Sequence, residues 1–205
     1  MNPSSKIADF CSRLLDLLLL NLLFILTSVP IVTIGPALCA LYSVTLKMVC
    51  DEDSHLIRSY FHAFRINFRK ALPVSMAFLL MFLLLLADLW IALTTPGAFY
   101  LAIGIFSMFL LVLLLTAVTY FFPILARFQF TTRQVFQNML HMIASSPGTV
   151  FALAVLNAPV VFFLCYSVYT AAAAAVFLMM IGFAAIGYVQ SFLLRKLFRP
   201  YEQGQ

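Results

Sequence analysis

Charge is the property that this sequence lacks most. Only 9% of its 205 residues are charged, whereas 64% are hydrophobic. Soluble globular domains carry roughly 25% charged residues, so this composition excludes a water-soluble fold. The seven acidic residues are outnumbered by twelve Lys and Arg, which gives a net charge of +5. Because the basic residues form no long cluster and no nucleic-acid-binding motif, we expect no nucleic acid partner and interpret them as signals of membrane topology.

Paired cysteines and catalytic motifs are missing as well. The four cysteines (Cys11, Cys39, Cys50 and Cys165) are scattered and form no C-x-x-C pair. We therefore expect free thiols rather than a disulfide framework or a metal site. The histidines are not spaced as in H-E-x-x-H, and the sequence contains neither G-x-S-x-G nor a phosphate-binding glycine loop. We predict that the protein is not an enzyme and uses no cofactor.

The apolar stretch from Leu14 to Cys50 would exceed ~50 Å as a single helix, against a hydrocarbon core of ~30 Å. Pro30 disfavours helix in the residue before it, and Gly35-Pro36 gives a flexible turn followed by a good first helical residue. We predict two antiparallel spans, 14–28 and 37–49, joined by an apolar structural turn at Pro30, Gly35 and Pro36. Both an outer turn and a turn that re-enters the bilayer fit this pattern.

Two later segments are amphipathic. In residues 54–70 apolar residues repeat at helical spacing, and Arg58, His62, Arg65 and Arg69 follow one edge of that apolar face. We expect a short helix lying in the interface, with its basic edge towards lipid headgroups, that then turns into the next span. Residues 131–144 show a similar division into an apolar and a polar stripe, and Ser145-Ser146-Pro147-Gly148 ends that helix.

The remaining apolar stretches predict four further spans at about 71–94, 99–126, 149–166 and 172–194. The sequence thus predicts an all-α fold: a polytopic transmembrane helical bundle of six spans, with two amphipathic helices on the cytoplasmic side, in one domain over residues 1–205. With six spans, all twelve Lys and Arg fall on the same side of the membrane. The positive-inside rule then places both termini in the cytoplasm.

Asp16 and Asp88 are the acidic residues inside the predicted spans. A carboxylate buried in a membrane is a candidate functional group. However, Asp16 lies within one turn of Arg13, with which it could pair, and Asp88 lies beside Trp90 near the outer interface. We therefore favour interfacial positions for both acids over a proton relay.

Three motifs in the first third of the chain are distinctive: Asn21-Leu22-Leu23-Phe24 followed by residues 30–37 (PIVTIGPA), then Ala40-Leu41-Tyr42, then residues 64–71 (FRINFRKA). Together they resemble the YesL family of small integral membrane proteins of Gram-positive bacteria. The resemblance also covers the length and the pattern of spans. Members of that family are typically encoded beside ABC-type sugar importers and polysaccharide-degrading enzymes. The resemblance therefore implies a bacterial plasma membrane location and an accessory role in carbohydrate uptake, and it supplies no catalytic or ligand-binding residues.

Two functions fit these observations. The first is an accessory or regulatory component that binds the permease subunits of a carbohydrate ABC importer. Its contacts with a partner or with anionic lipid would come from the basic edge and its neighbours: Arg58, His62, Arg65, Asn67, Arg69 and Lys70. The alternative is an independent small-solute or ion transporter or channel that acts as a homo-oligomer. In that case the Pro30–Pro36 element would line the site, and Asp16 or Asp88 would bind a cation or proton.

Overall fold

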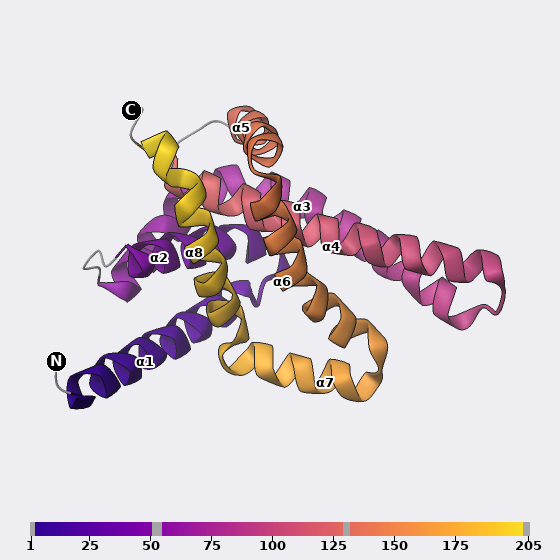
Figure 1. Ribbon diagram of the computed structural model, residues 1–205, viewed down its shortest axis with the longest axis horizontal. Helices are drawn as coiled ribbons and strands as arrows, with labels where there is room; N and C mark the ends of the chain where they lie inside the picture. Colours follow the sequence, from indigo (N-terminus) through magenta and orange to yellow (C-terminus); the bar gives the residue numbers. More distant parts are fainter. Residues whose placement is uncertain (1–2, 51–54, 129–131, 203–205) are drawn as a thin grey trace.

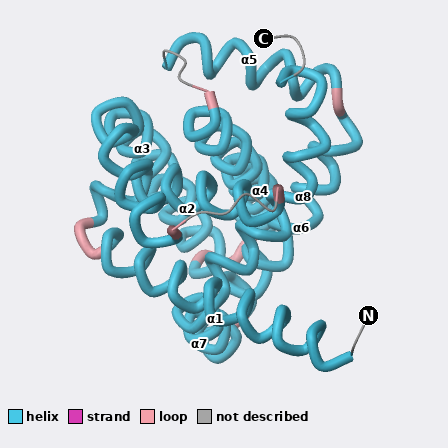
Figure 2. Tube along the Cα trace, turned by 90° about the vertical axis from the view of Figure 1, so that its left-hand side faces the viewer, coloured by secondary structure: helices cyan, strands magenta, loops and turns pink. Residues whose placement is uncertain are grey.

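In the computed structural model the chain is helical. The structure describes residues 3–50, 55–128 and 132–202, with the side chains of 11–50, 55–128, 132–163, 167, 169–196 and 198. These residues form eight α-helices and two short helical segments, and this part of the chain contains no strand (Figures 1 and 2). The elements are α1 (Pro3–Ser28), η1 (Ile31–Thr33), α2 (Ile34–Val49), α3 (Leu56–Thr94), α4 (Ala98–Arg127), α5 (Thr132–Ser145), α6 (Pro147–Tyr166), α7 (Val168–Phe177), η2 (Leu178–Gly182) and α8 (Phe183–Glu202).

Among the described residues, five helices are long and apolar enough to cross a membrane. A sixth span arises if α5 and α6, which meet at a bend of 101°, are counted as one broken span. The predicted all-α fold, with several helices that could span a membrane, is therefore confirmed. Ser54 and Thr131, which begin the two predicted amphipathic segments, lie outside the described residues.

The central element is α2, which packs against α1, α3, α4 and α8 and lies between α3 and α4 in Figure 2. Eleven of its sixteen residues are buried, as expected for a helix that is apolar on every side. The helix begins at Ile34, three residues before the predicted start, so Gly35 and Pro36 belong to its first turn rather than to the preceding turn. That preceding turn consists of Pro30 and the 3-10 segment η1, where the Thr33 hydroxyl donates to the carbonyl oxygens of Thr27 and Pro30.

The prediction of a turn between residues 70 and 71 was wrong. Residues 56–94 form a single helix, α3, whose 39 residues correspond to about 58 Å. The sequence at this point, Lys70-Ala71-Leu72, consists of good helix formers, and the helix continues through Pro73. A change from amphipathic to apolar composition does not by itself end a helix. From Leu56 onward, the expected amphipathic segment is the first part of α3 and packs against α2; its position in the interface stays a prediction.

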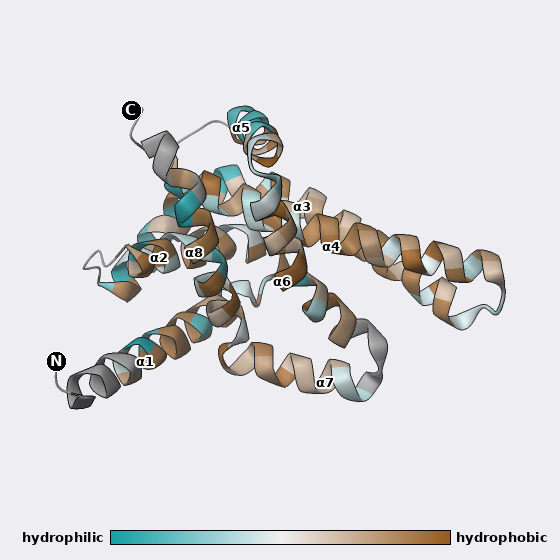
Figure 3. Cartoon of the chain, in the orientation of Figure 1, coloured by the Kyte–Doolittle hydropathy of each residue, from teal (hydrophilic) through white to brown (hydrophobic). Residues whose placement is uncertain are grey.

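The second half of α3 forms a long hairpin with α4. Gly97, at φ 145°, makes the tight turn between them at the predicted position, and the hairpin extends away from the other helices (Figure 1). Its surface is apolar along this extension (Figure 3) and exposes large side chains such as Leu80, Trp90, Phe99 and Phe106. Contiguous apolar surface of this kind is rare in water. Residues 71–94 correspond to about 36 Å, which is enough to cross a hydrocarbon core of ~30 Å.

The last predicted span, 172–194, is not one straight helix. The chain breaks at Ser167, which caps α7 by a reciprocal hydrogen-bond pair with Thr170. A π-helical segment, η2, then separates α7 from α8, and the two helices run in different directions (Figure 1). Such π segments are rare and change the course of a helix.

Candidate functional site

Asn21, in the second half of α1, holds the π-helical segment in place. Its side-chain amide donates to the carbonyl oxygens of Leu178 (3.2 Å) and Met179 (2.8 Å), and its carbonyl oxygen accepts from the Ala184 N–H (3.1 Å). A π turn disturbs the regular hydrogen bonds of a helix, and Asn21 pairs with backbone groups at and just after it. Asn21 is fully buried, so one carboxamide joins α1 to the start of α8.

A second set of polar side chains links four helices through the interior. The Tyr42 hydroxyl (α2) donates to Gln190 Oε1 (α8) at 2.6 Å, and Gln190 Nε2 donates to Asn157 Oδ1 (α6) at 2.9 Å. Asn157 Nδ2 approaches the hydroxyls of Thr116 and Thr119 (α4) at 3.4 Å. These two hydroxyls donate in turn to carbonyl oxygens of their own helix. We call this set the Tyr42–Gln190–Asn157 chain.

The direction of these bonds limits what the Tyr42–Gln190–Asn157 chain can do. Donors run from Tyr42 through two carboxamides to hydroxyls that end on backbone carbonyl oxygens. A carboxamide does not release its protons near neutral pH, and a backbone carbonyl oxygen passes no proton on. The arrangement is therefore suited to fixing the register of α2, α4, α6 and α8 rather than to conducting protons.

Two further contacts extend the α2–α8 interface towards the C-terminal end of both helices. The hydroxyls of Thr45 and Ser191 lie 2.8 Å apart, and both residues are fully buried. One helical turn further on, Arg195 donates from its guanidinium to the Val49 carbonyl oxygen at 2.6 Å. A basic side chain that caps the last carbonyl groups of a helix also interacts favourably with the helix dipole.

The predicted basic edge lies on the surface of α3. Arg58, His62, Arg65 and Arg69 are exposed, as is Lys70. Asn67, which we grouped with them, is buried instead, and its amide donates to the Ala63 carbonyl oxygen at 3.0 Å. At about 100° per residue, Asn67 lies about 180° from Arg58 around the helix. It therefore shares the inner face with Ala63.

Asn67 and His62 line a polar pocket of 220 Å³ between α2, α3 and α4. Lys47 and Ser43 come from α2, and Arg127 comes from the end of α4. The sequence places these residues far apart, and only the antiparallel packing of α2 and α4 against α3 brings them together. Their N–H and O–H groups give this end of the molecule a concave surface rich in donors.

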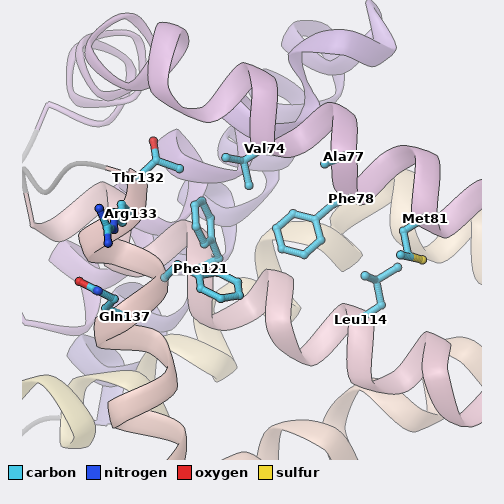
Figure 4. A pocket seen from close by; sticks show the side chains of 10 residues that line it. Val74, Ala77, Phe78, Met81, Leu114, Phe121, Thr132, Arg133 and Gln137 are labelled. Carbon is cyan, nitrogen blue, oxygen red and sulfur yellow. The ribbon is translucent and has the colours of Figure 1, made fainter.

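A larger groove of 750 Å³ lies where α5 meets the α3–α4 hairpin (Figure 4). Val74, Ala77, Phe78 and Met81 of α3 and Leu114 and Phe121 of α4 form its apolar part. Thr132, Arg133 and Gln137 of α5 lie at one end in Figure 4, and Met81 and Leu114 lie at the other.

The two acidic residues of the predicted spans are not in the interior. Asp16 is half-buried on α1, and Asp88 is exposed on the outer part of α3. Arg13 donates to the Tyr188 hydroxyl at 2.8 Å, and its pairing with Asp16 stays a prediction. In the described part of the chain, no group of three or more His, Cys, Asp or Glu side chains could hold a metal ion.

Sequence reasoning missed the buried carboxamides of Asn157 and Gln190. The signal that could have found them is their position: each is a polar residue inside a long uncharged stretch, where an unpaired polar group is costly and a partner must exist. Which partner each side chain finds depends on how the helices pack.

Comparison with known families gives a match in the first half of the chain. The model of the family described as "Protein of unknown function, DUF624" matches residues 17–89, which is less than half of the chain. This segment contains Asn21, the turn at Pro30, Tyr42 and the basic edge of α3, and the match is consistent with the YesL resemblance of the same part of the chain. No curated protein and no solved structure matches the chain.

Proposed function

We propose that this chain is an accessory or regulatory subunit of a carbohydrate importer of the ABC type and that it binds the importer's permease subunits in the membrane. The observation that carries the proposal is that the carboxamides buried between the helices pair with other side chains and with the backbone, as in the Tyr42–Gln190–Asn157 chain and at Asn21. A bundle fixed in this way is suited to presenting outer surfaces to a partner.

Two outer surfaces support a membrane partner. The α3–α4 hairpin exposes large apolar side chains along its length, so it can pack against transmembrane helices of another protein. The basic edge of α3 precedes the apolar part of that helix, in which Asp88 is the one charged residue, and it can contact acidic groups of the same partner. Stable interfaces bury about 1,200–2,000 Å², which a two-helix hairpin of this length can supply.

The proposal of an importer as the partner is supported by the resemblance to the YesL family, whose members are typically encoded beside sugar importers. The bacterial plasma membrane location rests on the same resemblance. The cytoplasmic placement of both termini rests on the distribution of Lys and Arg.

The experiment that tests this proposal is affinity purification of the tagged protein from native membranes in mild detergent, followed by mass spectrometry. We expect permease subunits in stoichiometric amounts. Arg65→Glu should reduce their recovery several-fold because it reverses a charge on the basic edge. Lys196→Glu, the same change at an exposed position of α8, should leave recovery unchanged.

Two results would count against the proposal. One is the absence of permease subunits together with unchanged sugar uptake when the protein is deleted. The other is recovery of the protein alone as a defined oligomer that moves a solute in liposomes, which would favour the independent transporter.

A further inference from the structure

The groove in Figure 4 has the form of a site for an amphiphile. Its apolar part follows α3 from Val74 to Met81, seven residues or about 10 Å. Beyond Met81 the hairpin surface stays apolar, with Leu84 of α3 and Leu113 of α4 exposed. A hydrocarbon chain longer than the groove can therefore continue along the hairpin for about 10 Å beyond Met81 before it reaches Asp88.

The polar end of the groove lies at the end of the hairpin where the basic residues stop and the apolar part begins. Val74 is one turn after Arg69 and Lys70, and between Lys70 and Arg127 the only charged residue is Asp88. Arg133, exposed on the first turn of α5, lies at this end with Thr132 and Gln137 (Figure 4). In a membrane-spanning hairpin this boundary is the depth at which lipid phosphates lie.

We propose that the groove binds one anionic phospholipid. Its phosphate is held by Arg133, with Gln137 and Thr132 as further donors, and one acyl chain lies on Val74, Ala77 and Phe78. A guanidinium matches the oxygen geometry of a phosphate and binds it through two parallel hydrogen bonds.

Charge complementarity favours an anionic lipid over a zwitterionic one. Of the described residues that line the groove, only Arg133 is charged. The lining therefore offers no carboxylate to a choline or ethanolamine group, and the nearby Arg69 and Lys70 add positive potential. A transmembrane helix of a partner would fill the apolar part but would leave the guanidinium against apolar surface, which is unfavourable.

The test is native mass spectrometry of the purified full-length protein with dioleoyl phosphatidylglycerol, dioleoyl phosphatidylcholine or glycerol 3-phosphate. We expect one phosphatidylglycerol to bind more tightly than phosphatidylcholine. Arg133→Gln should weaken phosphatidylglycerol binding about tenfold or more because a charge-assisted hydrogen bond is lost. Arg58→Gln, which removes an exposed arginine of α3 outside the groove, should not weaken it.

A second pair of variants tests the apolar part. Ala77 is exposed in the groove, so Ala77→Trp fills it without disturbing the core and should also abolish tight binding, whereas Leu83→Trp, at an exposed position of the same helix outside the groove, should not. Equal binding of both lipids, or equal weakening by Arg133→Gln and Arg58→Gln, would overturn the proposal. Binding of glycerol 3-phosphate as tight as that of phosphatidylglycerol would overturn it in favour of a soluble phosphate ligand.

Discussion

At the scale of single residues, Gln190 is the junction of the buried hydrogen bonds. Its side chain accepts from Tyr42 and donates to Asn157, and it is 2% exposed. Water does not reach such a position to replace a lost partner, so each group depends on its neighbour. The Tyr42–Gln190–Asn157 chain should therefore behave as a unit when it is mutated.

We predict that Gln190→Leu destabilises the protein by roughly 1–2 kcal/mol, because it leaves the Tyr42 hydroxyl and the Asn157 carbonyl oxygen without their partner. Thermal unfolding in detergent measures the effect as a lower melting temperature. Tyr42→Phe in the Gln190→Leu background should cost less than Tyr42→Phe alone, since the two residues share a bond. Strictly additive losses would contradict the coupling.

Sequence patterns predict which face of a helix a residue occupies better than they predict its hydrogen-bond partner. The basic edge of α3 was predicted from its spacing, and four of its residues are exposed as expected. Asn67 was misplaced although the same helical spacing puts it on the opposite face. The partners of Asn21 are carbonyl oxygens more than 150 residues away, and no local pattern encodes that distance.

At the scale of elements, the contact between α2 and α3 depends on one missing side chain. A Cβ at Gly35 would lie 2.3 Å from Ser75 Cβ and 3.1 Å from the Ala71 carbonyl oxygen. The Ala71 oxygen is a backbone atom and the Ser75 Cβ is bonded directly to the backbone, so neither can move aside as the end of a flexible side chain can. The two helices can therefore approach this closely only with glycine at position 35.

We predict that Gly35→Ala lowers stability by about 1–3 kcal/mol, the usual cost of overpacking a core. Gly148→Ala is the matched control, because a Cβ there would have no neighbour within 4 Å. We expect a lower melting temperature for Gly35→Ala than for Gly148→Ala when both are measured in the same detergent. A Gly35→Ala protein as stable as the Gly148→Ala protein would show that α2 and α3 are not packed in this way.

The positions of the helices were largely predictable from the sequence, but the points at which they continue, bend or break were not. The apolar runs and the amphipathic stripe of α5 gave helices close to the observed ones, and the glycine turn at position 97 was found from its residue types. The continuity of α3 and the bend at η2 were missed. Residue types alone did not decide either case, because α3 continues through Pro73, whereas the chain changes direction at η2, which ends at Gly182.

At the scale of the whole molecule, the two hairpins reach different depths. Gly35 lies against Ser75, and the Thr27 hydroxyl at the end of α1 lies 2.6 Å from the Tyr60 hydroxyl of α3. The α3–α4 turn begins after Thr94, nineteen residues or about 28 Å further along α3. The turn at Pro30 therefore lies level with Ser75, about 9 Å beyond Arg69 at the end of the basic edge and about 28 Å short of the turn at Gly97. This favours a first hairpin that re-enters on the side where it began, and it leaves the expected sidedness of the Lys and Arg residues unchanged.

We predict that single cysteines at these two turns differ in their access from outside the cell. In a variant without the four native cysteines, Ala98→Cys should react with a membrane-impermeant maleimide in intact cells, and Val32→Cys should not. Both positions are exposed on the protein surface, so a difference reports depth in the membrane. Equal labelling of both would favour six full spans.

The contacts between α2 and α8 also have a consequence for how the protein is made. Tyr42, Thr45 and Val49 emerge early from the ribosome, but their partners Gln190, Ser191 and Arg195 follow about 146 residues later. At ~5–20 residues per second this delay is roughly 7–30 s. During that time α2 lacks the partners that α8 supplies to Tyr42, Thr45 and Val49, so a chain that stalls before α8 should be held by the insertion machinery or degraded. The first hairpin to be synthesised is thus the last part of the bundle to be completed.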